Sequence, residues 1–560
     1  MLRPVPPVGE IPQATAELAR KVHPRGTDEM RVRDALGPLF VDTDFTTGVF
    51  AEMHSALGQP GLSPALLTMV MILQHRHNLS DEDAARAVAD RISWKYAIGL
   101  DLDDAGFDAS VLTEFRTRLA EEGRADGLLE LMLDRLKTAG LVKAGGRQRT
   151  DSTHVIACVR RLNRIETVGE TLRVALEAIA AISPAFIVAL LEAGWDERYG
   201  RKVETCRLLS RKNASAQALA DQIGADGAKL MAAIDAGPIA GWMNDLAEVR
   251  VLRTVFDQQY TTTAAGRLRL RTVEELPPAV GRIHSPHDVE ARYSTKDTGD
   301  TPTEWVGSKA HLTESCDADL PNLVTDVHAT AATEPDVVAT TTIQDKLINR
   351  GLAPGEHVTD GGYPSAANIT ASADRNITLV APVTVLTGRN AKQGTFTPAD
   401  FTIDWTAGVA TCPAGAASRS MKPDKRGLVT FAFSRRDCRP CPIRQRCTLA
   451  KPDVPRRITI HPEPVHEARM AAHAAQDTDT WRRTYNSRAG IEGTISEAVR
   501  GPNLRHARYR GITKQHLQNV LAAMAINIGR LGAWFDTRPA TRRRPTRVHQ
   551  LCVTNGLAAA

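Results

Sequence analysis

The sequence predicts a multidomain α/β protein, and three observations support this fold class. The chain has 560 residues, which at about 150 residues per domain leaves room for several domains. Hydrophobic residues make up 42% and charged residues 24% of the chain, a balance that excludes a mostly disordered or collagen-like protein. Strand-like segments in the middle of the chain are mixed with helical ones, as in an α/β sheet.

Residues 1–140 are expected to form an N-terminal helical domain, a candidate for contact with DNA. Ser63 and Pro64 are a cap and first-turn pair that begins a helix running to about His77. Ser80 is followed by three acidic residues, which favour a helix start through the helix dipole. Short helices joined by tight turns are typical of helix-turn-helix domains, and also of many helical domains that bind no DNA.

Two segments are expected to build the sheet, with a helical insertion between them. Residues 141–160 hold a strand-like run that carries Asp151, and residues 161–265 are rich in Ala and Leu and read as helical. In residues 266–390 strands return and are followed by a helix and another strand, an order that indicates an α/β sheet. The elements expected there are strands Val306–Thr313 and Leu323–Thr330, helix Asp336–Arg350 and strand Glu356–Asp360.

The last third of the chain is expected to contain a β-rich segment, then a helical segment and then a basic tail. Residues 391–460 are expected to form a small β-rich insertion that contains four clustered cysteines. Residues 461–535 are expected to be helical, with one helix from about Thr484 to Arg500 and another from about Thr513 to Trp534. Residues 536–560 are expected to be a basic, disordered tail.

Basic residues gather in two stretches, although the net charge is only +5. Between Arg482 and Lys514 there are eight basic and two acidic residues, and residues 537–560 contain five arginines and no acid. Such a local excess suits DNA, but a solvated helix face followed by a loose tail gives the same pattern. The candidate DNA-binding residues are Tyr485, Arg488, Arg500, Arg505 and Arg508.

Four of the eight cysteines fall within one window of 36 residues. Two of them form a C-x-x-C pair, and clustering of this kind in a chain with otherwise isolated cysteines favours metal over disulfides. Four thiolates would bind Zn²⁺ tetrahedrally as a structural site, although one cysteine lacks a near neighbour and an empty knuckle remains an alternative. The cysteines are Cys412, Cys438, Cys441 and Cys447.

Three acidic residues are candidates for chemistry. Asp151 lies within RTDST, and Asp360 ends a predicted strand within VTDGGY, at the sheet edge where α/β proteins place ligands. Tyr485, Arg488 and Glu492 are spaced i, i+3 and i+7, so on a helix they share one face. Each acid alone also has an ordinary interpretation as a turn residue or a surface charge.

Together, the three carboxylates would make a site of hard oxygen ligands, for which Mg²⁺ or Mn²⁺ is the fitting ion. Two such ions about 3.5–4 Å apart can activate a water or 3′-hydroxyl for phosphoryl transfer. Arg488 would suit a phosphate, and Tyr485 would suit stacking or hydrogen bonding beside it.

With these motifs the sequence resembles the DDE transposases of bacterial insertion sequences, in the group with a Y-(2)-R-(3)-E-(6)-K signature. Tyr485, Arg488 and Glu492 supply the first three positions. SPHDVEAR, WVGSKAHLTES and VTDGGYPS are similar to segments around the family's second acid. With its N-terminal helices and its cysteines, the chain is most similar to the eleven-eighty-two insertion-sequence family, over roughly residues 25–535.

The resemblance implies an RNase H-like core in which Asp151, Asp360 and Glu492 bind two metal ions. It also implies that the N-terminal domain, residues 1–140, helps to recognise the terminal inverted repeats. The further implications are DNA cleavage, strand transfer to target DNA and at least a homodimer on DNA. One position departs from the signature, because Val499 stands where a basic residue is expected and Arg500 follows it. Glu497 is a rival of Glu492, but it would face away from Arg488.

Two alternatives remain at this point: a decayed transposase that only binds DNA, and an RNase H-like nuclease.

The longest apolar stretch, Val174–Trp195, is interrupted by charged residues and a proline, and no apolar signal segment precedes it. We therefore expect no membrane association and a cytoplasmic, nucleoid-associated protein.

Overall fold

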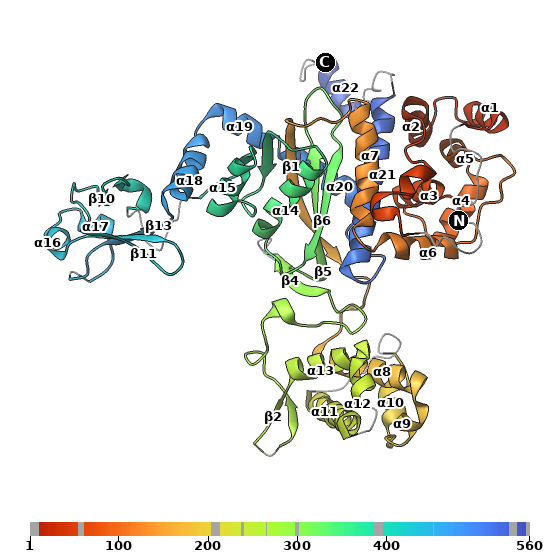
Figure 1. The fold of residues 1–560 in the computed structure, drawn as a ribbon, viewed down its shortest axis with the longest axis horizontal. Helices are drawn as coiled ribbons and strands as arrows, with labels where there is room; N and C mark the ends of the chain where they lie inside the picture. The colour runs from red at the N-terminus through yellow and green to blue at the C-terminus, as the bar shows by residue number, and fades with distance from the viewer. Residues whose placement is uncertain are drawn as a thin grey trace.

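The structure of the chain, a computed structural model, is arranged around a central sheet (Figure 1). The N-terminal helices pack beside the sheet, a helical insertion projects from another side, and residues 396–460, called the cysteine module below, stand at the far end from the N-terminal helices. The structure describes residues 10–53, 61–202, 213–236, 240–264, 266–296, 302–384, 396–451, 453–536 and 546–555.

The central sheet is mixed, which agrees with the predicted α/β class. β1 lies between β5, to which it is antiparallel, and β7, to which it is parallel; β7 is in turn parallel to β8. The long strand β5 pairs with β4 along its first part and with β6 along the rest. The strands are β1 (Arg147–Ile156), β4 (Arg292–Lys296), β5 (Thr303–Ser315), β6 (Val324–Ala331), β7 (Glu356–Thr359) and β8 (Thr378–Val380).

Helices cover both faces of this sheet. On one face, α14 (Asp336–Asn349) and α15 (Ala366–Asp374) pack against β6 and β8. On the other face, α20 (Ala489–Arg500) and α21 (Ile512–Trp534) pack against β1, β5 and β6. Alternate residues of β1 therefore face different helices, which determines the contacts of the site below.

The N-terminal helices share their hydrophobic core with the sheet. The apolar helix α21 packs against α2, α3 and α7 on one side and β6 on the other, so that Leu73, Leu521 and Val327 belong to one buried cluster. Ser63 and Ser80 cap α3 and α4, as the sequence predicts. The helices are α1 (Gln13–Val22), α2 (Asp28–Leu36), α3 (Pro64–Arg76), α4 (Asp81–Asp90), α5 (Ile92–Ile98), α6 (Ser110–Leu119) and α7 (Arg124–Thr138).

The helical insertion between β1 and β4 has a core of its own, in which Leu172, Ile234 and Leu252 are fully buried. A short hairpin, β2 (Tyr260–Thr262) with β3 (Leu268–Leu270), closes it. Its helices are α8 (Arg164–Ile182), α9 (Pro184–Val188), α10 (Trp195–Tyr199), α11 (Asn213–Ala236), α12 (Ala240–Asp245) and α13 (Ala247–Gln259).

The cysteine module is a small β structure with its own apolar core around Phe431. It contains a two-stranded sheet and a three-stranded sheet, and two very short helices that carry cysteines lie between the last two strands of the latter. The elements are β9 (Thr402–Asp404), β10 (Val409–Thr411), β11 (Ser420–Pro423), β12 (Val429–Ala432), α16 (Arg435–Cys438), α17 (Arg444–Cys447) and β13 (Arg457–Ile460). Helix α18 (Glu463–Ala475) leads back to the sheet.

Two predicted elements differ in the structure. The helix expected from Thr484 to Arg500 is interrupted between α19 (Asp479–Asn486) and α20, where Ile491 N–H donates to the carbonyl of Arg488 three residues back. The Arg149 guanidinium also binds the Ser487 carbonyl at 2.5 Å, which explains the tightened turn. In the tail that was expected to be disordered, residues 547–554 form α22 (Arg547–Thr554); residues 537–545 and 556–560 lie outside the described residues.

Candidate active site

The register of two parallel strands makes two of the predicted catalytic carboxylates neighbours. β1 and β7 pair with Thr150 opposite Thr359, and Asp151 and Asp360 are the next residues along the two segments. Adjacent strands are about 4.8 Å apart. Asp151 and Asp360 therefore lie side by side where β7 ends, although 209 positions separate them in the sequence.

Arg488 links the third predicted carboxylate to the first. Its Nη1 lies 3.2 Å from Asp151 Oδ2 and its Nη2 lies 2.6 Å from Glu492 Oε1. Glu492 is in the first turn of α20, and its side chain is 60% exposed, compared with 16% for Asp151. The guanidinium thus bridges a half-buried carboxylate of the sheet and an exposed carboxylate of the helix.

Asp151 is electrostatically unusual. Burial raises its pKa to about 6, and the nearby charge of Asp360 acts in the same direction. The Ser152 N–H donates to Asp151 Oδ1 at 2.7 Å, and this bond and the positive charge of Arg488 act against the rise. The raised pKa of Asp151 beside a second carboxylate indicates local negative charge, which favours a bound cation.

A cavity of about 540 Å³ opens beside these residues. It is lined by Asp151 and Glu492, whereas Asp360 is not among its lining residues; Asp360 Oδ1 accepts a 2.8 Å hydrogen bond from the Gly362 N–H. Acidic and basic side chains share the walls. The remaining lining residues are Ser152, Thr153, His154, Ser294, Thr295, Lys296, Thr303, Trp305, Lys309, Asp336, Ile495 and Arg505.

Asp336 is a fourth carboxylate of the cleft, which the sequence analysis did not single out. Its Oδ2 accepts a 3.0 Å hydrogen bond from Ser152 Oγ, and its Oδ1 lies 2.8 Å from Lys309 Nζ. The available signal was its place at the first residue of α14, the helix that is separated from the end of β6 by four residues. An acid at a helix N-terminus is explained by the helix dipole alone, so this signal did not distinguish it.

A buried ionic network holds α20 against the sheet. Glu314 of β5 is fully buried, and its Oε1 accepts from Arg149 Nε at 2.6 Å. Its other oxygen accepts from Thr494 Oγ1 of α20 at 2.6 Å and is bound by Arg530 of α21. The helix that carries Glu492 is therefore anchored to two strands and to a second helix.

The same network separates Glu497 from Glu492. Arg530 Nη2 lies 2.9 Å from Glu497 Oε2, so that Glu497 faces α21, whereas Glu492 lines the cleft. The structure therefore brings Glu492, and not its rival, to Asp151 and Arg488.

Tyr485 and Arg500 have contacts on their own helices. The Tyr485 ring stacks on Trp481, with ring centroids 4.7 Å apart and an interplanar angle of 14°. Arg500 is exposed and donates to Ser496 Oγ at 2.5 Å. Neither residue lines the cleft.

Arg505 and Arg508 differ from each other. Arg505 lines the cleft and lies 3.4 Å from Thr153 Oγ1. Arg508 donates from Nη1 to the Leu79 carbonyl at 2.7 Å and also binds the Asn78 side chain. Its guanidinium thus connects the C-terminal helices to the N-terminal domain.

The structure brings the four clustered cysteines together. Cys412, Cys438, Cys441 and Cys447 line one cavity of about 30 Å³, and all four are free thiols. Burial raises the pKa of Cys447, and the other three thiols contribute in the same direction. Cys412, which lacks a near neighbour in the sequence, is therefore supplied by the chain after β10.

Neither the carboxylates of the cleft nor the four cysteines are preorganised as a metal site. Among the described residues, no group of three or more His, Cys, Asp or Glu side chains is arranged as a metal site.

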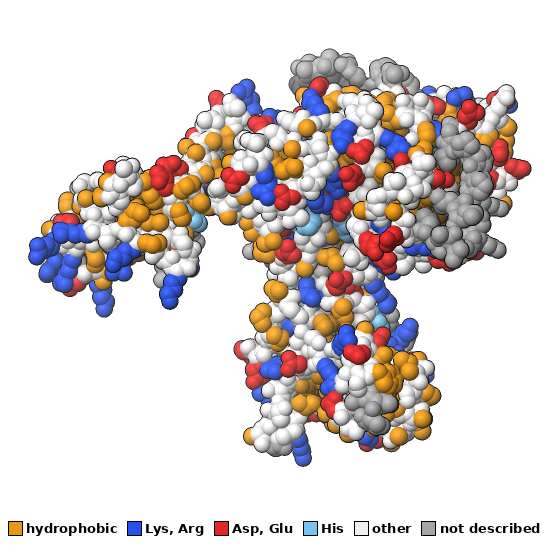
Figure 2. Space-filling model, in the orientation of Figure 1, with side chains coloured by type: hydrophobic (Ala, Val, Ile, Leu, Met, Phe, Trp, Pro, Cys, Tyr) orange, Lys and Arg blue, Asp and Glu red, His pale blue; other side chains and the backbone are white. Residues whose placement is uncertain are grey.

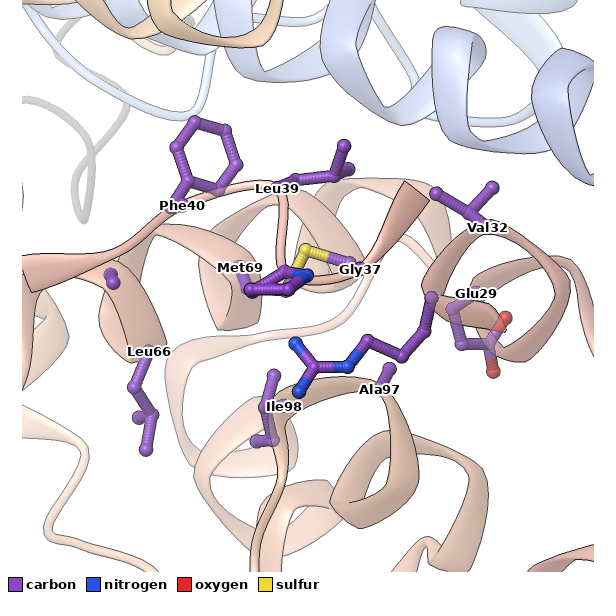
Figure 3. A pocket seen from close by; sticks show the side chains of 12 residues that line it. Glu29, Val32, Gly37, Leu39, Phe40, Leu66, Met69, Ala97 and Ile98 are labelled. Atoms are coloured by element: carbon purple, nitrogen blue, oxygen red, sulfur yellow. The ribbon is translucent and has the colours of Figure 1, made fainter. Parts of the chain in front are cut away.

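A separate cavity in the N-terminal domain does not resemble a catalytic site. It has a volume of about 20 Å³, enough for a single water. Figure 3 shows apolar side chains around it, among them Leu39, Phe40 and Met69. None of the predicted site residues lines it.

Two models of known families match the chain. "Transposase DDE domain" matches residues 411–532, which include the cysteines and α20, and "Transposase domain (DUF772)" matches residues 28–118 in the N-terminal helices. These matches indicate a transposase and support a place in the DDE transposase family. The searches of curated proteins and of solved structures give no match.

Within the described part of the chain, no helix has the length and apolar character needed to span a membrane.

Proposed function

We propose that this protein is a DNA transposase that cleaves the ends of an insertion sequence and transfers the strand to target DNA. The observation that carries the proposal is the convergence of Asp151, Asp360 and Glu492, from two paired strands and one anchored helix, beside a large polar cleft. The strand order β6-β5-β1-β7-β8 supports an RNase H-like core. We place the chain in the eleven-eighty-two insertion-sequence family.

The donor set fits Mg²⁺ or Mn²⁺. The three proposed ligands offer hard carboxylate oxygens, and the burial of Asp151 beside Asp360 leaves negative charge that a cation would neutralise. The chemistry that two such ions supply when bound is activation of a water or 3′-hydroxyl and charge stabilisation at the phosphodiester.

The residues of the chain have separate tasks in this proposal. Arg488 keeps Glu492 beside Asp151 and offers a cationic group to a phosphate. Lys296 and Arg505 line the same cleft and would balance the charge of the DNA backbone. Most of the rate acceleration would come from positioning and charge rather than from covalent chemistry with the protein.

We infer a structural role for the four cysteines as ligands of Zn²⁺. Their cavity of about 30 Å³ has room for one ion, and four thiolates are a typical closed zinc set.

The N-terminal helices would contact the terminal inverted repeats of the element. A homodimer would hold two DNA ends, and the protein would act at the nucleoid.

The test is an assay with the purified full-length chain and a labelled duplex that carries the terminal repeat and flank of its element, with Mg²⁺ or Mn²⁺. Asp360→Asn removes a proposed ligand with little change in shape, and Asp319→Asn neutralises an exposed aspartate outside the cleft as the matched control. Cutting and joining by the wild type and the control, but not by Asp360→Asn, are expected. Specific binding without cutting would favour the decayed transposase, cutting without joining a nuclease, and equal cutting by all three would exclude Asp360.

A further inference from the structure

The cysteine module carries the basic character of the chain. Between residues 396 and 460 there are twelve Lys and Arg and five Asp, an excess of seven positive charges. The whole chain has an excess of only five, so the rest of the molecule is net negative by two. A Zn²⁺ ion held by four thiolates has a net charge of −2, which would offset only part of this excess.

The register of the three-stranded sheet places part of this charge on one face. Met421, Phe431 and Ile458 are aligned across β11, β12 and β13, and the last two belong to the buried core. Because neighbours along a strand point to opposite faces, Lys422 and Arg457 lie on the other face. That face also carries Thr430 and Thr459, whose hydroxyls are 2.9 Å apart; it is a polar surface directed away from the core.

Several of these basic side chains have no protein partner. The side chains of Lys422, Lys425, Arg436, Arg439 and Arg457 are exposed, and within the described residues none of them makes a hydrogen bond or an ion pair. Figure 2 shows Lys and Arg side chains gathered at the end of the module that carries α16, at the left of the view. We call these five residues the basic face, although they come from three places: the outer face of the sheet, the turn after β11 and the segment around α16.

The acidic residues of the module are already engaged. Asp453 pairs with Arg435 at 2.5 Å, and Asp424 caps its own turn and pairs with Arg426 at 3.2 Å. Asp437 lies 4.0 Å from Arg419, while Asp400 and Asp404 accept hydrogen bonds from nearby backbone N–H groups. The basic face is thus not neutralised from within the module.

We propose that the basic face binds the phosphate backbone of DNA outside the catalytic cleft, without reading its sequence. The proposal rests on the proposed function and adds a second DNA contact to it. Exposed cations without protein partners attract a polyanion by counterion release. Of the two threonine hydroxyls that bond to each other, the one that accepts keeps its own O–H for a phosphate oxygen. Because the module stands away from the sheet (Figure 1), this contact would hold DNA at a distance from the cut site.

The test is the salt dependence of binding to a labelled duplex of unrelated sequence, measured by fluorescence anisotropy with the full-length chain. In one variant Lys422, Arg436 and Arg439 are all replaced by Gln. Each lost phosphate contact lowers the slope of log K against log salt by about 0.9, so we expect a decrease of ~2.7. A charge-retaining variant, K422R with R436K and R439K, is expected to keep the wild-type slope.

A matched control replaces Arg201, Arg250 and Arg267 of the helical insertion, which are also exposed, by Gln. An unchanged slope in the module variant, or an equal decrease in this control, would overturn the proposal. The proposal would also be overturned if the module variant lost more affinity for single-stranded RNA than for duplex DNA. The cleavage assay above fails or succeeds separately, since this measurement needs neither a terminal repeat nor a divalent metal.

Discussion

The cleft and the cysteine module are built in opposite ways. The cysteine cluster comes from one short window of the chain and from turns that are close in sequence, whereas the cleft joins residues from β1, the end of β7 and α20. Local spacing therefore determines most of the first site. The second site exists only when the pairing of β1 with β7 and the anchoring of α20 are both correct, and each prediction below tests one side of this difference.

The largest effect is expected from loss of the proposed zinc. Structural zinc in small domains contributes roughly 10 kcal/mol or more of apparent folding free energy. Cys441→Ser is expected to lose the metal and to unfold the module, while Ser434→Ala, beside α16, retains both. Metal content by mass spectrometry and proteolysis between residues 396 and 460 measure this. A wild-type chain purified without zinc and with an intact module would contradict it.

The next effect concerns the network that anchors α20. Arg530→Ala leaves the fully buried Glu314 with one arginine fewer, and breaking a buried ion pair typically costs about 3–5 kcal/mol. We expect a lower free energy of unfolding of the core in denaturant melts, with the cysteine module unaffected. As control, Arg250→Ala removes one arginine of an exposed pair and is expected to change stability by less than about 1 kcal/mol.

The third effect separates the two glutamates of α20. Glu492→Gln removes a proposed ligand and is expected to lower the cleavage rate about 10²–10³-fold, the usual cost of one preorganised electrostatic group. Glu497→Gln loosens the contact with Arg530 and is expected to lower the melting temperature while cleavage persists. If cleavage were lost in Glu497→Gln and kept in Glu492→Gln, the proposed metal ligand would be Glu497 and not Glu492.

These comparisons also show what a sequence can and cannot reveal. The predicted strand around Asp151, helix Asp336–Arg350 and strand Glu356–Asp360 correspond to β1, α14 and β7, because hydrophobic patterning and end signals are local. The interruption of the helix at Ser487 comes from Arg149 on β1, a contact across 338 positions that no local pattern encodes. The core shared by the N-terminal helices and the sheet through α21 depends on long-range packing in the same way.

The smallest effect is expected at Asp336, and it tests whether the cleft uses more than the three carboxylates that the sequence indicated. Asp336 contacts Ser152, the neighbour of Asp151, and Lys309, so it is a positioning residue in this proposal. Loss of an outer group of a metal site typically costs about 10–100-fold in metal affinity or activity. Asp336→Asn is expected to weaken Mn²⁺ binding, measured by electron paramagnetic resonance titration without DNA, within that range.

Asp345→Asn, which changes an exposed aspartate on the same helix, serves as the matched control, and binding of unrelated duplex DNA should be unchanged in both variants. If Asp336→Asn binds Mn²⁺ as tightly as the wild type but melts at a lower temperature, Asp336 only holds α14 to Lys309. Complete loss of Mn²⁺ binding, as expected for Asp151→Asn, would instead make Asp336 a direct ligand. Mn²⁺ binding that is weakened about 10–100-fold but not lost is the result that supports our proposal, in which Asp336 positions Asp151 through Ser152.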